Sequence, residues 1–113
     1  MKNLDDVTTG TFDREVLQSG LPVLVEFYTS WCPGCRAVQP ALESLAAEFE
    51  GKARIVGVNV EEEPLLGQRY DISAVPTLAF FKDGQLKGGF QGGRPAAVLR
   101  AALEELIAVR LEA

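Results

Sequence analysis

The sequence contains no histidine among its 113 residues, and only two of those residues are cysteines. Histidine is the side chain most often used as a general base at neutral pH, and it is the commonest metal ligand. A structural zinc site needs four nitrogen or sulfur ligands, which one copy of this chain cannot supply. These absences exclude histidine-based catalysis, and they leave a zinc site only if two chains share it.

Long apolar runs and concentrated positive charge are also missing. No stretch approaches the ~20 apolar residues of a membrane-spanning helix, and no basic segment precedes an apolar one near the N-terminus, so we expect neither a secretory signal nor a transmembrane helix. The net charge is −5 with scattered Lys and Arg, which argues against nucleic acid as a partner. Hydrophobic residues make up 47% and charged residues 24%, as in globular proteins. The length predicts one domain, residues 1–113.

Both cysteines lie in Trp31-Cys32-Pro33-Gly34-Cys35, where an apolar run ends and a helical pattern begins. A thiolate that attacks a disulfide forms a mixed disulfide, which a second nearby thiol must resolve. Residues i and i+3 on the first turn of a helix share a face. A helix start also offers unpaired backbone N–H groups and partial positive charge, which favour the thiolate. The spacing therefore predicts a redox-active dithiol/disulfide pair.

Hydrophobic patterning predicts two strands and a long helix around this pair. Residues 22–28 form an almost unbroken apolar run, which is typical of a central strand buried on both faces. Residues 33–49 place apolar side chains on one helical stripe, and Pro40 inside it should kink the helix. Residues 53–60 form the next strand. Because a helix connects the two strands, they should be parallel.

Shorter elements are predicted before and after this unit. Residues 7–9 suit an edge strand, and a short helix should run from Thr11 to a stop at Gly20. The acidic cluster 61–63 is interpreted as the solvated start of a short helix with Pro64 in its first turn, in preference to an ion site.

A hairpin and a final helix complete the predicted architecture. Residues 78–81 should form a strand, and Asp83-Gly84 is a strong turn signal that returns residues 85–90 antiparallel. Residues 95–111 should form a helix whose inward face carries Leu99, Leu103, Leu106 and Ile107. The predicted class is α/β, with a mixed sheet and helices on both faces.

The order of these elements around Trp31, Cys32 and Cys35, with Val75-Pro76-Thr77 about forty residues later, closely resembles the thioredoxin family. The resemblance covers about residues 12–108 and extends to Phe27, Pro40, Lys82-Asp83-Gly84 and Gly92. It implies a thioredoxin fold, with a central sheet of about five strands flanked by four helices, two on each face. It also implies that Pro76 is a cis-proline beside the dithiol and that the Val75 backbone hydrogen-bonds an extended substrate.

The resemblance assigns a role to each group in the reaction. Cys32, expected to be the more exposed sulfur, is the attacking thiolate, and Cys35 is the resolving thiol. Glu26, the one charge in an apolar strand, should be buried, with its pKa raised by desolvation, and should take the Cys35 proton. The alternative for Glu26 is an edge-facing position on a partly exposed strand.

A substrate-binding surface is expected around the dithiol. Trp31 should shield the sulfurs and take part in docking, rather than belong to the core. Val75, Pro76, Gly92 and Gly93 should complete the surface, because glycine allows close backbone approach. Arg36 either adds positive charge near the thiolate or points into solvent. The aromatic residues assigned to the core are Tyr28, Phe80 and Phe81.

Three positions depart from the family pattern. Pro33-Gly34 stands where Gly-Pro is usual, Glu26 where Asp is usual, and Gly57 where a Lys is usual. If Cys32 is the N-cap and Pro33 the first helical residue, then Gly34 and Cys35 both offer an N–H to the Cys32 sulfur. We therefore expect a more acidic Cys32 and a more oxidising couple than with Gly-Pro, an effect that the flexibility of Gly34 opposes in part. Without a lysine at position 57, the pKa of Glu26 should lie higher than in relatives.

The function expected from this resemblance is the reduction of protein disulfides by dithiol-disulfide exchange. A thioredoxin reductase, a flavoprotein using NADPH, should return the electrons, so the chain should take part in electron transport and redox homeostasis without a bound cofactor or metal. We expect a cytoplasmic monomer with no nucleic acid or membrane partner. The alternatives are a disulfide oxidase or isomerase of higher potential, and a binding module that keeps the fold without turnover.

Overall fold

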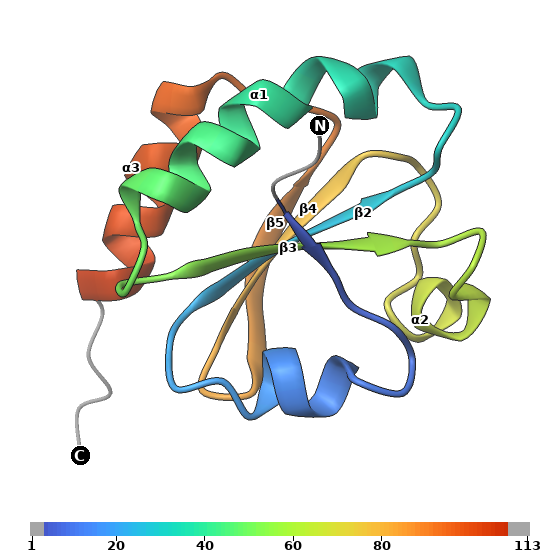
Figure 1. Ribbon diagram of the computed structural model, residues 1–113, viewed down its shortest axis with the longest axis horizontal. Helices are drawn as coiled ribbons and strands as arrows, with labels where there is room; N and C mark the ends of the chain where they lie inside the picture. The colour runs from blue at the N-terminus through green and yellow to red at the C-terminus, as the bar shows by residue number, and fades with distance from the viewer. Residues whose placement is uncertain (1–3, 109–113) are drawn as a thin grey trace.

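The computed structural model describes residues 4–108, in which five strands form one mixed sheet (Figure 1). The strand order is β1-β3-β2-β4-β5. β3 runs parallel to β1 and β2, whereas β4 runs antiparallel to β2 and β5. The parallel pair predicted around the long helix is therefore confirmed. The strands are β1 (Asp5–Asp6), β2 (Val23–Tyr28), β3 (Arg54–Asn59), β4 (Thr77–Lys82) and β5 (Gln85–Gln91).

Helical elements cover both faces of the sheet. They are η1 (Asp13–Leu17), α1 (Pro33–Glu48), α2 (Pro64–Arg69) and α3 (Ala96–Ala108). Figure 1 shows α1 and α3 on one face, with α2 and the short η1 on the other. η1 is a single π-helical turn, in which the Gln18 N–H donates to the Asp13 carbonyl at 2.8 Å. The expected arrangement of two helices on each face is confirmed.

Each face of the sheet holds its own hydrophobic core, and β2 contributes to both. Leu24 packs with side chains of α1 and α3, whereas Val25 and Phe27 pack with side chains of η1 and α2. Successive side chains of a strand point to opposite faces, so the almost unbroken apolar run of β2 fits a strand buried on both sides. Glu26 follows Val25 and therefore shares the face of Leu24.

The N-terminal edge strand lies earlier than predicted. Asp5 and Asp6 pair with Val56 and Gly57 of β3, and residues 7–9, expected to form the strand, lie beyond it. Val7 is buried and its N–H still donates to the Gly57 carbonyl, but the Thr11 N–H then turns back to Thr8. Aspartate is uncommon in strands, so residue preference alone does not locate β1. The predicted end of the last helix, residues 109–111, lies outside the described residues.

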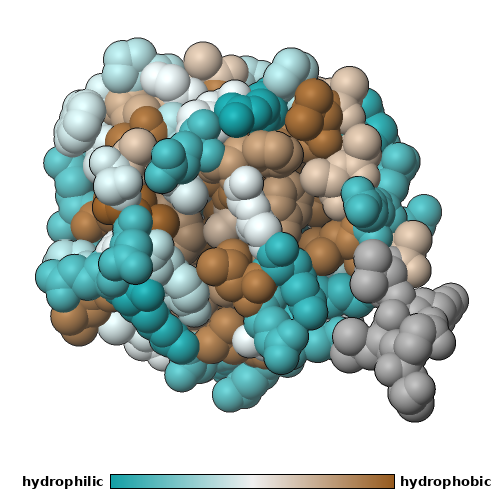
Figure 2. Space-filling view, turned by 180° about the vertical axis from the view of Figure 1, so that it is seen from behind, coloured by the Kyte–Doolittle hydropathy of each residue, from teal (hydrophilic) through white to brown (hydrophobic). Residues whose placement is uncertain are grey.

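The predicted hairpin between β4 and β5 is confirmed. Asp83 and Gly84 both have positive φ, 55° and 78°, as a type I′ turn requires. β5 forms the outer edge of the sheet, and Figure 2 shows hydrophobic and hydrophilic residues interspersed on that side of the molecule. Within residues 4–108, no helix has the length and apolar character needed to cross a membrane.

Candidate active site

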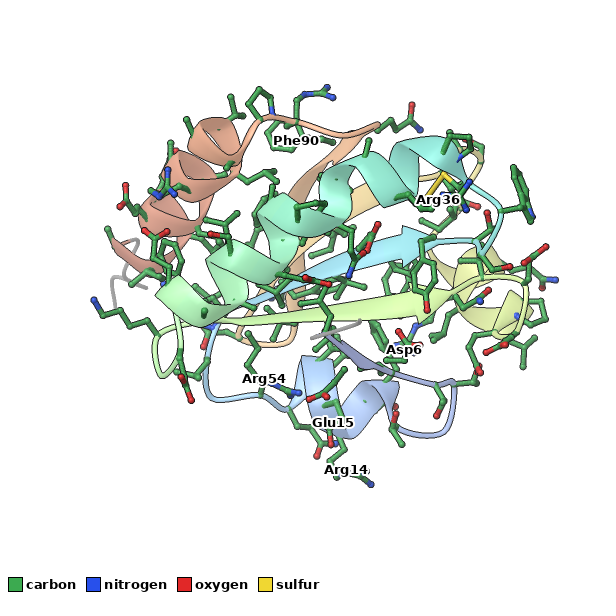
Figure 3. All side chains as sticks on the ribbon, turned by 45° about the horizontal axis from the view of Figure 1, so that its top comes forward. Asp6, Arg14, Glu15, Arg36, Arg54 and Phe90 are labelled. Carbon is green, nitrogen blue, oxygen red and sulfur yellow. A yellow bond between two sulfur atoms is a disulfide. The ribbon has the colours of Figure 1, made fainter. Side chains whose placement is uncertain are left out.

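The two cysteines lie where β2 ends and α1 begins. Cys32 has extended backbone angles and is the N-cap of α1, Pro33 occupies the first turn, and Cys35 follows on that turn. A disulfide joins Cys32 to Cys35, whose Cα atoms are 5.2 Å apart. Figure 3 shows the sulfur–sulfur bond at the start of α1, next to Arg36. The predicted redox pair is therefore present in its disulfide form.

The backbone of the first turn hydrogen-bonds the Cys32 sulfur. The Cys35 N–H donates to Cys32 Sγ at 3.0 Å, which confirms the predicted N-cap. Within the described part of the chain, Gly34 makes no such bond, although the Pro33-Gly34 order was expected to add it. The donor that is present would exist with either order of the dipeptide. In the disulfide form, the structure thus supports the cap but not the second donor.

The two cysteines are equally buried, with exposed fractions of 3% for Cys32 and 4% for Cys35. The expectation that Cys32 is the more exposed is therefore wrong for the disulfide form. The two cysteines differ instead in their surroundings, because each lines a different groove. We define the Cys32 groove by Thr29, Trp31, Cys32, Pro33, Gly34, Val60, Ile72, Ser73, Ala74 and Val75. We define the Cys35 groove by Tyr28, Thr29, Ser30, Cys35, Arg36, Gln39, Pro40 and Glu43.

Trp31 forms one wall of the Cys32 groove and is 61% exposed, so it does not belong to the core. Its indole N–H donates to Glu61 Oε2 at 2.7 Å, and Ser30 Oγ donates to Glu61 Oε1 at 3.4 Å. The Glu61 N–H in turn donates to Asn59 Oδ1 at 2.9 Å. The carboxylate of Glu61 therefore holds the indole ring at the edge of the groove.

The acidic cluster 61–63 was expected only to form the solvated start of a helix, but two of its carboxylates also bind other parts of the chain. Glu61 binds Trp31, and Glu63 Oε1 accepts hydrogen bonds from the N–H and the hydroxyl of Thr9, at 2.8 and 2.9 Å. α2 does begin at Pro64, as predicted. Within residues 4–108, no group of three His, Cys, Asp or Glu side chains is placed to hold a metal ion.

Pro76 is preceded by a cis peptide bond and lies against the first turn of α1, as expected. A Cβ atom on Gly34 would lie only 3.3 Å from Pro76 Cδ, so the missing side chain allows this contact. The Gly92 N–H donates to the Pro76 carbonyl at 2.7 Å, and Gly93 faces Val38 of α1. Val75 lines the Cys32 groove, whereas Pro76, Gly92 and Gly93 are not among its lining residues.

Glu26 is 2% exposed and lies in the middle of the sheet. It pairs with Gly57 of β3 on one side and with Leu78 of β4 on the other. These two neighbours exclude the alternative of an edge-facing glutamate on a partly exposed strand. A buried carboxylic acid is therefore present on the face of the sheet that α1 covers.

Tyr28 was assigned to the core, but it is only half-buried. Its hydroxyl donates to Asp6 Oδ2 at 2.8 Å. Burial, followed by this hydrogen bond and by nearby carboxylates including Glu26, raises the pKa of Tyr28 well above its ordinary value. Phe80 and Phe81 are buried, as predicted.

Arg36 is exposed beside the disulfide, and its guanidinium donates to the Ser30 carbonyl at 3.3 Å. It is thus held to the loop that precedes the helix, while its charge stays within the surroundings of the sulfurs. Both alternatives expected for Arg36 therefore hold in part: its side chain is exposed to solvent, and it adds positive charge near the sulfurs.

Sequence reasoning missed three contributors to the site: Glu61, Thr29 and the segment 72–74. Glu61 follows the carboxyl end of β3 as Cys32 follows that of β2, and the carboxyl ends of parallel neighbours meet at one edge of a sheet. That rule would have pointed to Glu61. The hydroxyl of Thr29 is buried without a hydrogen-bond partner in the described part of the chain, and no sequence signal identifies it.

Comparison with known proteins agrees with this geometry. The thioredoxin family model matches residues 3–105. Thioredoxin 1 of Nostoc sp. is 42% identical over 99 residues, covering 88% of this chain and 92% of the relative. The thioredoxin of Synechocystis sp. is 36% identical over 107 residues, covering 95% and 100%, and that of Rickettsia bellii is 39% identical over 82 residues, covering 73% and 78%. The chain therefore belongs to the thioredoxin family, whose members are thiol-disulfide oxidoreductases.

Proposed function

We propose that the chain reduces protein disulfides with Cys32 as the attacking thiolate and Cys35 as the resolving thiol. The observation that carries this assignment is the hydrogen bond from the Cys35 N–H to Cys32 Sγ, at 3.0 Å. A donor aimed at a sulfur favours its charged form, and the positive end of the α1 dipole acts in the same direction. Cys35 lies one turn further on, within reach of the mixed disulfide.

The reaction then proceeds in two exchanges. The Cys32 thiolate attacks one sulfur of the substrate disulfide, and the other substrate sulfur leaves as a thiolate that takes up a proton. Cys35 then loses its proton and attacks Cys32 Sγ in the mixed disulfide. This second step releases the remaining substrate thiolate and leaves the Cys32–Cys35 disulfide seen in the structure. The substrate gains two electrons and the protein loses two.

Glu26 is our proposed base for the second exchange. Its burial disfavours the carboxylate, which would let it exchange a proton near neutral pH, and it lies on the face of the sheet that α1 covers. We expect Glu26→Gln to slow the resolving step by about 100-fold and to remove its pH dependence. Stopped-flow kinetics over a pH series measures this step, and an unchanged pH profile would remove Glu26 from the mechanism.

Substrate is proposed to dock along the Cys32 groove. The exposed indole of Trp31, held by Glu61, and the backbone of Val75 line it. An extended segment of substrate would hydrogen-bond the backbone of Val75, and Pro76, Gly92 and Gly93 would complete this surface. A modest apolar surface of this kind suits transient contact with many proteins.

The electrons are proposed to come from NADPH through a flavin-dependent thioredoxin reductase, with no cofactor resident in this chain. The chain would act in the cytoplasm as a monomer with a single domain spanning residues 1–113. The support for these proposals is the similarity to proteins named thioredoxin over most of the chain.

Insulin reduction followed by turbidity tests the proposed activity, with Cys32→Ser as the control that should be inactive. Activity that survives in Cys32→Ser would contradict the mechanism. Titration of the Cys32/Cys35 couple against glutathione or dithiothreitol separates a reductase from an oxidase or isomerase. A potential close to the reducing value characteristic of thioredoxins supports a reductase, whereas one tens of millivolts higher would indicate an oxidising role.

A further inference from the structure

One row of residues crosses four strands of the sheet at the level of Glu26. Leu78, Glu26, Gly57 and Asp6 are successive register partners from β4 through β2 and β3 to β1. Register partners on neighbouring strands present their side chains on the same face. Glu26 and Asp6 therefore share a face, about two strand spacings or ~10 Å apart, and Gly57 lies between them without a side chain.

The Tyr28 ring fills the space above Gly57. A Cβ atom built on Gly57 would lie 3.0 Å from Tyr28 Cε1 and 2.9 Å from Asp6 Oδ1. From this position the Tyr28 hydroxyl reaches Asp6 Oδ2 at 2.8 Å. The ring thus extends from β2 across β3 to β1, beside Glu26. Any side chain at position 57 larger than glycine would displace the ring, the Asp6 carboxylate, or both. Figure 3 shows Asp6 at the edge of β3, toward the end of the sheet where the disulfide lies.

We propose that Tyr28, lying over Gly57 and hydrogen-bonded to Asp6, is a positioning residue that shields Glu26 from water on the β1 side and thereby sets the proton affinity of Glu26. The inference deepens the proposed function, because it rests on the role of Glu26 as the base for Cys35. Tyr28, Gly57 and Asp6 would thus influence the reaction together, through Glu26 and not through contact with the sulfurs.

The carboxylates near Tyr28 act on its hydroxyl in the same direction as burial. Carboxylates disfavour a second negative charge nearby, so Asp6, Glu26 and Glu62 oppose ionisation of Tyr28. Because the pKa of Tyr28 is raised, chiefly by burial, its hydroxyl remains a neutral donor to Asp6 at neutral pH. β4 contributes only the apolar Leu78 at this level. Asp6, Glu26 and Glu62 act on Tyr28, and the other titratable or charged side chains beside it, which line the Cys35 groove, are Cys35, Arg36 and Glu43. The positive charge of Arg36 opposes the effect of the carboxylates.

Carbon-13 NMR of carboxyl-labelled glutamate tests the proposal without relying on activity. The Glu26 resonance is assigned by its loss in Glu26→Gln and is titrated in both redox forms. In Tyr28→Ala we expect the proton affinity of Glu26 to fall about tenfold or more, because water then reaches the carboxyl group. Gly57→Ala should lower it in the same direction, since the added Cβ displaces the Tyr28 ring, the Asp6 carboxylate that holds the ring, or both. The pH profile of the resolving step should shift with the titration.

Tyr70→Ala provides the matched control, since Tyr70 packs with Phe12, Phe27 and Phe81 in the opposite core. This variant should lose stability without moving the Glu26 titration. Circular dichroism establishes that each variant folds. If Tyr28→Ala does not fold, the titration of Glu26 in Gly57→Ala decides between the outcomes. An unchanged Glu26 titration in the folded variants would overturn the proposal. A shifted titration combined with an unchanged pH profile in Glu26→Gln would leave the shielding intact and refute instead the role of Glu26 as a base.

Discussion

At the scale of single residues, Thr29 presents an unusual feature of the site. It is 6% exposed, it lines both the Cys32 groove and the Cys35 groove, and its hydroxyl has no hydrogen-bond partner within residues 4–108. A buried hydroxyl that exchanges water for no partner costs about 1–3 kcal/mol. Thr29 therefore combines a position next to the dithiol with a cost in stability.

We predict that Thr29→Val raises the free energy of unfolding by about 1 kcal/mol. Valine keeps the branched shape of threonine and replaces the buried hydroxyl with a methyl group. Urea denaturation of the oxidised protein measures the change, with Thr29→Ser as the control that keeps the hydroxyl and loses a methyl group. A valine variant no more stable than the parent would show that the hydroxyl is satisfied in solution.

Individual site residues were predictable from the sequence when chain neighbours identified them. Cys32 and Cys35 are recognisable by their spacing, and Glu26 by its position in an apolar strand. Tyr28 and Glu61 were misinterpreted because their partners, Asp6 and Trp31, are more than twenty positions away in the chain. Sheet pairing brings those partners together, and no local pattern in the sequence reports it.

At the scale of elements, the start of α1 determines the chemistry of Cys32. In the disulfide form, Cys35 supplies the N–H that reaches the Cys32 sulfur, so any contribution of the Gly34 N–H must come in the reduced protein. We predict that exchanging the dipeptide, Pro33→Gly with Gly34→Pro, removes that contribution and raises the pKa of Cys32. The pH dependence of thiol alkylation measures it. A pKa that is unchanged or lower would contradict the idea.

An ion pair links the two helices on the α1 face. The Arg100 guanidinium donates to both carboxylate oxygens of Glu48, with the shortest distance 2.9 Å. This hydrogen bonding, ahead of the attraction between the charges, lowers the pKa of Glu48 below its ordinary 4.5. The contribution to stability is therefore present above that value and is lost as the pH falls through the lowered pKa. Because both groups are at the surface, the contribution is small.

We predict that Glu48→Gln lowers the thermal unfolding midpoint slightly at neutral pH. The difference from the parent should disappear as the pH falls through the lowered pKa of Glu48, below 4.5, since the parent's Glu48 then becomes neutral too. Thermal unfolding over an acid pH series measures it. Glu50→Gln, at an exposed glutamate with no ion pair in the described part of the chain, is the matched control. A difference between Glu48→Gln and the parent that persists in strong acid would contradict the assignment to this ion pair.

The elements most accurately predicted are those with a strong local signal. α1, β2 and the hairpin at Asp83-Gly84 combine clear periodicity with definite start, stop or turn residues. β1 was misplaced because it is two residues long and consists of aspartates, which have little preference for strands. Its position depends on pairing with β3, a contact between distant parts of the chain.

At the scale of the whole molecule, the sheet separates two cores and positions the site at one of its edges. The sequence predicted a mixed sheet with a parallel pair joined by α1, because crossover connections constrain the topology. The strand order and the contact of Pro76 with Gly34 required the structure. The site is thus assembled from the loops after β2 and β3 and the segment before β4, and those parts meet only in the complete fold.

The division of labour between the cysteines is the central claim, and trapping of the mixed disulfide tests it most directly. Cys35→Ser is incubated in reduced form with a disulfide-bonded protein, and the products are mapped by mass spectrometry. The account predicts a stable mixed disulfide on Cys32, because no thiol remains to resolve it, and no comparable adduct on Cys35 in Cys32→Ser. An adduct that forms on Cys35 as readily as on Cys32, or full turnover by Cys35→Ser, would contradict the account.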